Sequence, residues 1–326
     1  MSMLARRGLL GAAASSLALP ALVGTAHAAF PAQPVRIIVP WNAGGLVDVL
    51  VRILGPSMSA TLGQPVVVEN RAGANGAVGT QAVARSPANG HTLIAANAET
   101  HAINPLIYPR LPYDPARDFQ PVTLFARGPL ALITRPGLGA ENLQGFLDLV
   151  RRQPGKVTYA SWGIGSTSHL AMERLTRLAR LEMLHVPFTG AAPASTALVG
   201  GQVDAMFLNA GPAEALARDG RPKVLAVGSR ERMDILPAAP TLVEQGLDME
   251  GANWFGLLAP ARTPAAAAQR VAEVVAEGLG NAATKESFRL QGAIPTTSAP
   301  DEMGRFIAED RERWDAVVKD LNIRLD

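Results

Sequence analysis

The sequence predicts an α/β protein with two lobes, each a largely parallel sheet flanked by helices. First, short β-branched runs alternate with longer helical patterns, which is typical of β-α-β units. Second, removing a leader of 28 residues from 326 leaves 298, a length that favours two domains of ordinary size over one overgrown core. Third, 48% of the residues are hydrophobic, which is enough for two packed cores.

The elements of the first lobe follow from β-branched runs, helical spacing of apolar residues and glycine turns. In order, we expect a strand at Val35–Val39, a turn at Gly44-Gly45, a helix at Leu46–Leu62, a strand at Val66–Val68, a turn at Gly73–Gly76 before a short helix, and a strand at Thr92–Ala96. The proline-rich segment Asn104–Pro115 is predicted to be an ordered surface excursion.

A second set of units begins near residue 130. Its predicted elements are the strand Leu130–Thr134, the helix Asn142–Arg152, the strand Val157–Ser161, the helix Thr167–Leu178, and strands at His185–Val186, Ala205–Leu208 and Val224–Val227. A strand at Trp254–Leu258 and three amphipathic helices after Pro264 complete the chain. Because these helices need a sheet to cover, we expect the C-terminal part to return to the first lobe. Lobe 1 is then residues 29–128 plus 252–326, lobe 2 is the insertion 129–251, and two strands form the hinge.

The N-terminus has the pattern of a cleaved secretory signal. Arg6 and Arg7 precede an apolar run from Leu9 to Val23, and Ala26-His27-Ala28 supplies an A-x-A cleavage site, so residues 1–28 are predicted to be removed. The arginine pair permits the twin-arginine route, and the ordinary Sec route is the alternative. The sequence has no cysteine, which excludes a lipoprotein anchor and disulfides. No later segment has about 18 uninterrupted apolar residues, so the mature chain is not predicted to be embedded in a membrane.

The charge balance argues against a nucleic-acid partner. Cleavage removes two of the 30 basic residues and none of the 28 acidic ones, so the mature chain is formally neutral. No lysine- or arginine-rich face that would release counterions from nucleic acid is apparent.

Two strand-to-helix turns are the predicted binding elements, because open α/β sheets bind ligands outside the carboxyl ends of their strands. They are Pro40–Asp48, with paired glycines, and Ser161–His169, with several hydroxyl side chains. A helix N-terminus has unpaired N–H groups and roughly half a positive charge, so each turn can hold an anion without lysine or arginine. The alternative is an ordinary turn in which Ser166 or Thr167 caps the helix.

The residues do not support a catalytic or metal site. Ser161 lacks the first glycine of a G-x-S-x-G elbow, and Gly163-x-Gly165 lacks the third glycine of a dinucleotide fingerprint. His91, His101, His169 and His185 are dispersed, so we expect neither a metal nor a cofactor. His169 is interpreted as a ligand contact or as a hydrogen-bonded residue behind the site. Asp48 is expected to brace the Gly44-Gly45 loop.

The sequence resembles the periplasmic solute receptors of tripartite tricarboxylate transporters, also called Bug proteins, over nearly all of residues 30–326. The resemblance rests on PVRIIVP at 34–40 with Gly44, Gly45 and Asp48, on LGQPVVVENR at 62–71, on THAINP at 100–105 with LPYDP at 111–115, and on GGQVD at 200–204. It implies a periplasmic protein with a two-lobed, type II-like binding-protein fold. It also implies a cleft that closes on a small carboxylate and holds it through backbone amides, hydroxyls and bridging waters.

The resemblance also implies a set of residues at the ligand site. It comprises Trp41, Asn42, Ala43, Gly44, Gly45, Asp48, His101, Ser161, Gly163, Gly165, Ser166, Thr167, His169, Phe188, Gly190, Leu208 and Asn209. The chain departs from the usual family pattern at Asn42-Ala43, Val47, Ile164 and Leu208, and each change removes polarity or rigidity. These departures disfavour an amino-acid ligand and favour a carboxylate with an apolar or aromatic body.

Three functional classes are open at this stage. The first is a receptor that delivers its ligand to integral-membrane transporter subunits. The second is a sensory receptor whose closed form docks on a membrane sensor kinase. The third, a secreted hydrolase, requires a poised nucleophile and base that the motifs do not supply.

Overall fold

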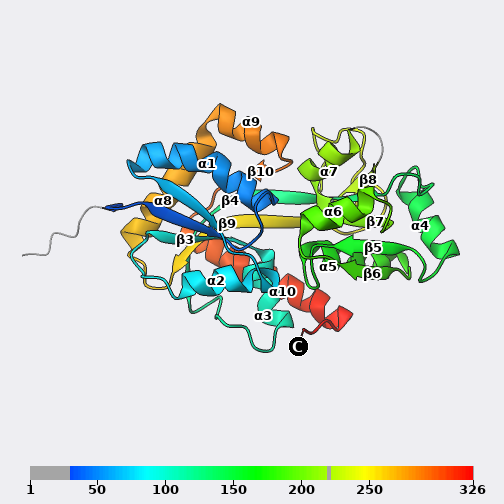
Figure 1. The fold of residues 1–326 in the computed structure, drawn as a ribbon, viewed down its shortest axis with the longest axis horizontal. Helices are drawn as coiled ribbons and strands as arrows, with labels where there is room; N and C mark the ends of the chain where they lie inside the picture. Colours follow the sequence, from blue (N-terminus) through cyan, green and yellow to red (C-terminus); the bar gives the residue numbers. More distant parts are fainter. Residues whose placement is uncertain (1–29, 219–221, 326) are drawn as a thin grey trace, which may run out of the picture.

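The computed structural model describes residues 30–218 and 222–325. The predicted leader, residues 1–28, lies outside the described residues. Strands and helices form two groups side by side, joined by two long strands, so the α/β fold with two lobes is confirmed (Figure 1).

The first group contains both ends of the described chain. Its elements are β1 (Val35–Val39), α1 (Leu46–Leu62), β2 (Val66–Asn70), the 3₁₀ turn η1 (Ala74–Gly76), α2 (Ala77–Ala84), β3 (Thr92–Asn97), the π-helical turn η2 (Glu99–Ile103), α3 (Asn104–Ile107), β9 (Ala252–Pro260), α8 (Ala265–Gly280), α9 (Ala282–Leu290), β10 (Ile294–Pro295) and α10 (Pro300–Leu321). These elements make up the left part of Figure 1, with α10 reaching towards the second group.

The second group is continuous in sequence. Its elements are α4 (Leu143–Arg152), β5 (Thr158–Ser161), α5 (Thr167–Ala179), β6 (Leu184–Pro187), α6 (Ala191–Val199), β7 (Ala205–Asn209), α7 (Ala210–Ala217) and β8 (Lys223–Val227). The long strand β4 (Phe119–Thr134) connects the first group to this one.

The strand order is β2-β1-β3-β9-β4-β7-β5-β6, and β10 and β8 also pair with β4. The outer pairs β1–β2, β1–β3, β5–β6 and β5–β7 are parallel. Every pairing that involves β4 or β9 is antiparallel, so each sheet is mixed. Pro129 of β4 pairs with Ala252 of β9, and from Leu130 onward β4 pairs with β7 and β8. We propose this change of partner as the hinge, with lobe 2 at 129–251.

Each lobe has its own apolar core. Leu50 and Leu54 of α1 are buried against Val271 and Val275 of α8 beneath the first sheet. Phe146, Tyr159 and Phe207 occupy the corresponding place in the second. Complete burial of such a side chain stabilises the fold by about 1.5–3 kcal/mol.

The prediction of an ordered surface excursion at Asn104–Pro115 is correct in part, because Pro109, Arg110 and Pro112 are exposed in an irregular loop after α3. The segment starts inside a helical region, η2 followed by α3, and Asn104, Ile107 and Tyr113 are buried. The Tyr113 hydroxyl donates to the Thr100 carbonyl at 2.6 Å, and the Asn104 amide donates to the Asn75 carbonyl at 2.9 Å. Prolines predict turns at the surface, but here the Tyr113 and Asn104 side chains satisfy backbone carbonyl groups, which allows part of the segment to be buried.

Candidate functional site

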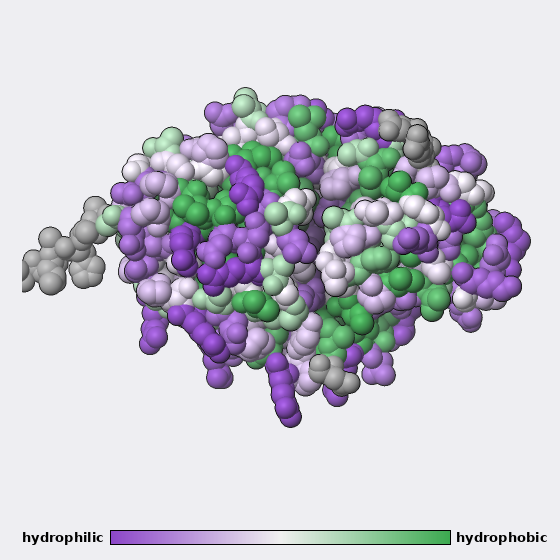
Figure 2. All heavy atoms as spheres, in the orientation of Figure 1, coloured by the Kyte–Doolittle hydropathy of each residue, from purple (hydrophilic) through white to green (hydrophobic). Residues whose placement is uncertain are grey.

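A cleft of about 870 Å³ lies between the lobes, and Figure 2 shows the groove between them. Ten of the residues expected at the ligand site line it: Trp41, Asn42, Ala43, Gly44, Gly45, Gly163, Phe188, Gly190, Leu208 and Asn209. Among the described residues that line the cleft, none is Asp, Glu, Lys, Arg or His. Any charge on a ligand must therefore be met by dipoles and hydrogen bonds.

Helix α1 begins at the cleft without a side-chain cap. Its N-cap is Gly45, and no side chain accepts from the first turn. The N–H groups of Leu46 and Val47, both in the cleft lining, have no hydrogen-bond partner within the described residues. Gly44 has φ +84°, a conformation that glycine adopts without strain. The start of α1 therefore presents free donors and a partial positive charge to the cleft.

Asp48 holds this loop from behind and does not line the cleft. Its Oδ2 accepts from the Gly44 N–H at 2.9 Å, and its Oδ1 accepts from Arg52 at 3.0 Å and from Asn70 at 2.9 Å. Burial by itself raises the pKa of the Asp48 carboxyl, but the hydrogen bonds from Arg52, Gly44 and Asn70 outweigh it and hold the pKa below its usual value. Asp48 is thus a brace for the loop, as the sequence predicts, and not a ligand contact.

Asp48→Asn is expected to loosen this loop. In either orientation the NH2 group of the amide would face a donor, either the Gly44 N–H or the Arg52 and Asn70 groups, so we expect stability to fall by about 1–3 kcal/mol. Ligand affinity should fall by roughly tenfold, because the helix amides lose their fixed position. Urea unfolding and calorimetric titration measure the two effects. The matched control is Asp315→Asn, which removes an exposed i,i+4 pair with Lys319 on α10; equal losses in both variants would contradict the bracing role.

A second uncapped helix faces the cleft from lobe 2. The N-cap of α6 is Gly190, with φ +132° and no side-chain cap. The N–H groups of Ala191 and Ala192, which also line the cleft, are without a partner in the described part of the chain. The Asn42 amide of lobe 1 donates to the Thr189 carbonyl at 3.3 Å, so the loops that begin α1 and α6 touch. One anion between them can accept from both lobes.

Three buried polar atoms at the cleft lack partners. Within the described residues, Trp41 Nε1, Asn75 Oδ1 and Asn209 Oδ1 are buried and make no hydrogen bond. All three side chains belong to residues that line the cleft. An unpaired buried polar group costs about 1–3 kcal/mol, so these atoms indicate a polar occupant.

The turn Ser161–His169 matches the predicted alternative in which Ser166 caps the helix, and its donors are used internally. Thr167 donates from its N–H at 2.9 Å and from its hydroxyl at 2.8 Å to Glu99 Oε1. The Ser166 hydroxyl donates to the Gly163 carbonyl and accepts from the His169 N–H. Of this predicted anion loop, only Trp162, Gly163 and Ile164 line the cleft. A carboxylate from the chain's own lobe 1 already occupies the start of α5.

Gly165 is a glycine for packing reasons. A Cβ atom at this position would lie 2.2 Å from Cδ1 of Ile107 in lobe 1, and φ is +74°. Its N–H donates to His169 Nδ1 at 3.1 Å. Gly165 therefore brings the two lobes close together and does not line the cleft.

His169 and Ser161 lie behind the cleft wall. The His169 ring stacks on that of His185 at 4.0 Å between centroids, and Tyr159 stacks on both. The Ser161 hydroxyl lies 2.7 Å from His185 Nε2, but Ser161 is fully buried and does not line the cleft. The pair resembles a nucleophile and base in spacing only, because no substrate could reach the hydroxyl.

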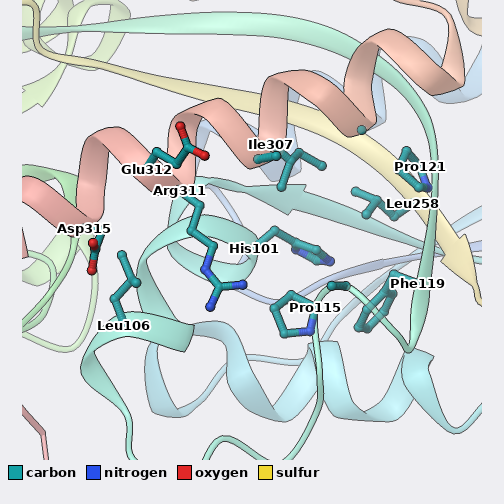
Figure 3. Close-up of a pocket in the computed structure, with 13 residues that line it drawn as sticks. His101, Leu106, Pro115, Phe119, Pro121, Leu258, Ile307, Arg311, Glu312 and Asp315 are labelled. Atoms are coloured by element: carbon teal, nitrogen blue, oxygen red, sulfur yellow. The ribbon is translucent and has the colours of Figure 1, made fainter.

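The prediction that His101 contacts the ligand disagrees with the structure. His101 is 1% exposed and lies edge-on to Phe119, and its Nδ1 lies 2.9 Å from the Thr100 hydroxyl. It faces a separate cavity of about 570 Å³ under α10, lined also by Ile307 and Arg311 (Figure 3). The THAINP motif therefore places this ring in lobe 1, away from the cleft.

Two buried histidines, His101 and His169, and the partly buried His185 make stability depend on pH. Burial lowers the pKa of His101 and His169 to about 3 and that of His185 to about 4, and the charge of a protonated His185 adds to the effect on His169. Each folded-state pKa lies below the unfolded value of about 6.5, so unfolding takes up protons below pH 6.5. The stability that the neutral rings contribute is complete above pH 6.5 and is lost as pH falls towards 4.

We therefore expect the free energy of unfolding to fall by up to about 4 kcal/mol per pH unit between pH 6 and 5, where three rings take up protons. Urea unfolding at each pH measures the slope. His101→Gln, with one titrating ring fewer, should reduce it by about a third. A stability that stays flat from pH 7 to 5 would show that the folded rings take up protons over the same pH range as the unfolded chain, so that their pKa values are not lowered.

Several cleft residues were not identified from the sequence. They are Ala72, Gly73, Ala74, Asn75, Asn97, Tyr108, Ala192, Asn253 and Leu325. The segment Gly73–Gly76 is predicted only as a turn, although its two glycines are a signal of the same kind as Gly44-Gly45. Asn253 and Leu325 line the cleft because the C-terminal part of the chain folds back onto lobe 1, and no local pattern indicates this contact.

No group of three or more His, Asp or Glu side chains suited to a metal ion occurs in the part of the chain that the structure describes. Across residues 30–218 and 222–325, no helix combines the length and apolarity needed to cross a membrane.

The two lobes and the neutral cleft define a solute-binding protein. Residues 50–323 match the family described as "Tripartite tricarboxylate transporter family receptor". Protein BugT of Bordetella pertussis is 35% identical over 91% of each chain. The chain belongs to this receptor family.

Two solved structures of similar sequence have the same fold. Rpa4515 of R. palustris with adipate has a TM-score of 0.87 and 32% identity, covering 90% of this chain and 99% of that one. MatC of Rhodopseudomonas palustris with bound malate has a TM-score of 0.82 and 33% identity, covering 89% of this chain and all of the other.

Proposed function

We propose that this protein is an extracytoplasmic receptor that captures a small carboxylate by closure of its lobes and delivers it to integral-membrane transporter subunits. The observation that carries the proposal is that two uncapped helix N-termini, α1 from lobe 1 and α6 from lobe 2, meet at one neutral cleft. Together they provide about one positive charge and several free N–H donors. The adipate and malate of related structures fit the same ligand class.

Closure follows from this arrangement. The oxygens of one carboxylate can accept from the Leu46, Val47, Ala191 and Ala192 amides together only when the lobes meet. The ligand then binds the closed form more tightly than the open form and shifts the population towards it. Trp41 Nε1 is a further donor in the same cleft.

The rest of the cleft suits an apolar or aromatic body. Trp162, Ile164, Phe188 and Leu208 line it, and Ile164 is 40% exposed although it is a large apolar side chain. Burying an apolar body here would contribute roughly 25 cal/mol per Å². We therefore propose a carboxylate whose remaining surface is largely uncharged.

The proposed location is the periplasm, after cleavage of the predicted leader at residues 1–28 by the Sec or the twin-arginine route. Transport and sensing use the same cleft, and they differ in the partner that recognises the closed form. Uptake of the ligand that is lost on deletion of the receptor would support transport. Intact uptake combined with loss of a ligand-dependent transcriptional response would instead establish the sensory role.

The direct test is a thermal-shift and calorimetric screen of the mature protein, residues 29–326, against paired probes that differ only at the carboxylate, namely hexanoate with hexanamide and benzoate with benzamide. A ligand at a hundred times its Kd should add about 2.7 kcal/mol to stability. We expect the acids to stabilise the protein and the amides to have little effect. Equal stabilisation by the amides, or no stabilisation by the acids, would overturn the carboxylate assignment.

A further inference from the structure

The side chain of Glu99 is a buried carboxylate that lies between the lobes. Glu99 is not among the predicted ligand-site residues. It lies in η2 of lobe 1 and has no solvent exposure. Oε1 accepts from the N–H and the hydroxyl of Thr167 in lobe 2 and from Trp162 Nε1 at 3.2 Å. Oε2 accepts from Asn253 Nδ2 at 2.8 Å. All four of these groups, which come from three residues, are donors, as an ionised carboxylate requires.

The donors around Glu99 are themselves fixed. Asn253 Oδ1 accepts from the Ala98 N–H at 3.1 Å and from the Trp254 N–H at 2.9 Å, so its amide group must turn Nδ2 towards Glu99. Thr167 is the first residue of α5, directly after its N-cap Ser166. The start of α5 is therefore both capped and neutralised, in contrast to those of α1 and α6.

Glu99 lies one layer behind the cleft. Two of its partners, Trp162 and Asn253, line the cleft, whereas Glu99 does not. The α5 N-terminus offsets only about half of the Glu99 charge. Since no cationic side chain is present among the described lining residues, a negatively charged group on this side of the cleft would meet the remaining negative charge. At an effective dielectric constant of about 20, two like charges roughly 10 Å apart weaken binding by on the order of tenfold.

We infer that Glu99 is a specificity determinant that selects acids with one negative charge. It takes the place of a ligand anion at α5, so only the α1 and α6 N-termini remain for a carboxylate, and a second carboxylate is repelled. This inference rests on the proposed function, because it specifies the charge of the carboxylate ligand. Trp162, held through its Nε1, becomes a fixed apolar wall for the uncharged end of that ligand.

The test compares acids of similar length and different charge at pH 7.5, with hexanoate against adipate and 4-methylbenzoate against terephthalate. Calorimetry on the wild-type mature protein should give at least about tenfold tighter binding of the singly charged acid in a pair that binds. This arm needs no variant and does not depend on how a mutant folds. Binding of the dicarboxylates as tight as that of the monocarboxylates would overturn the inference and leave the carboxylate-receptor proposal standing.

The second arm removes the charge with Glu99→Gln. The discrimination between the two acids should fall by on the order of tenfold, because the like charge is gone. The control is Glu286→Gln, an exposed glutamate on α9 paired with Arg289, which should keep the wild-type ratio. An unchanged ratio in a folded Glu99→Gln protein would assign the selectivity to another residue. If none of the four acids binds the wild type, the inference falls together with the proposed function.

Discussion

Gly211→Ala is expected to hold the lobes apart and to weaken ligand binding about a hundredfold. Gly211 lies in α7 of lobe 2, and a Cβ atom there would stand 2.1 Å from the backbone oxygen of Gln291 in lobe 1. A backbone atom cannot turn aside as a side chain can, so the closed form should lose about 3 kcal/mol. Only about one molecule in a hundred would then be competent to bind, which raises the apparent Kd by the same factor.

Calorimetry would give the Kd, and small-angle scattering would show the larger radius of gyration of the open form. The matched control is Gly280→Ala at the end of α8, where an added Cβ atom has no neighbour within 4 Å. In the Gly211→Ala variant, the fold of lobe 2 should be retained, because alanine has a higher helix propensity than glycine. Wild-type affinity in the Gly211 variant would mean that this contact between the lobes is not needed for binding.

Ala191→Pro should lower affinity for a carboxylate by roughly 10- to 150-fold while keeping the protein folded. Ala191 is the first residue of α6, where proline is favoured and its missing N–H costs the helix nothing. The variant therefore deletes one of the free amides at the cleft. A hydrogen bond to a charged group is worth about 1.5–3 kcal/mol, which corresponds to that loss of affinity.

The control is Ala282→Pro, at the first position of α9. The Asn281 side chain accepts from the N–H groups of Ala283 and Thr284, so the cap of this helix does not use the Ala282 N–H. Binding and unfolding are measured for both variants. We expect equal stability and a loss of affinity in the Ala191 variant alone. Loss of affinity in neither variant would place the anion away from α6.

Local pattern was sufficient for most of the regular structure. The predicted bounds of β1 and α1 match those observed, Val35–Val39 and Leu46–Leu62. The reason is that the signals are local, namely a β-branched run, helical spacing of buried residues, and glycines at both ends of the helix. The left-handed Gly63 at the end of α1 is such a signal.

The segment Asn104–Pro115 shows what local pattern could not predict. Its prolines suggested a surface path, but the hydroxyl of Tyr113 and the amide of Asn104 satisfy backbone carbonyls on neighbouring turns. These bonds allow Asn104, Ile107 and Tyr113 to be buried, although the loop between Ile107 and Tyr113 is partly exposed. The same packing turned His101 away from the cleft, although its motif had suggested a ligand contact.

The sequence by itself determined the α/β class, the order of the elements and the glycine loop that starts α1, because these depend on residues close together in the chain. The tertiary structure decided which helix N-termini are free. Thr167 and Glu99 are 68 residues apart, and only the packing of the two lobes brings that carboxylate to α5. A helix start has the same N–H donors in almost any sequence. Whether these donors are free for a ligand depends on whether a side chain from a distant part of the chain accepts from them in the fold.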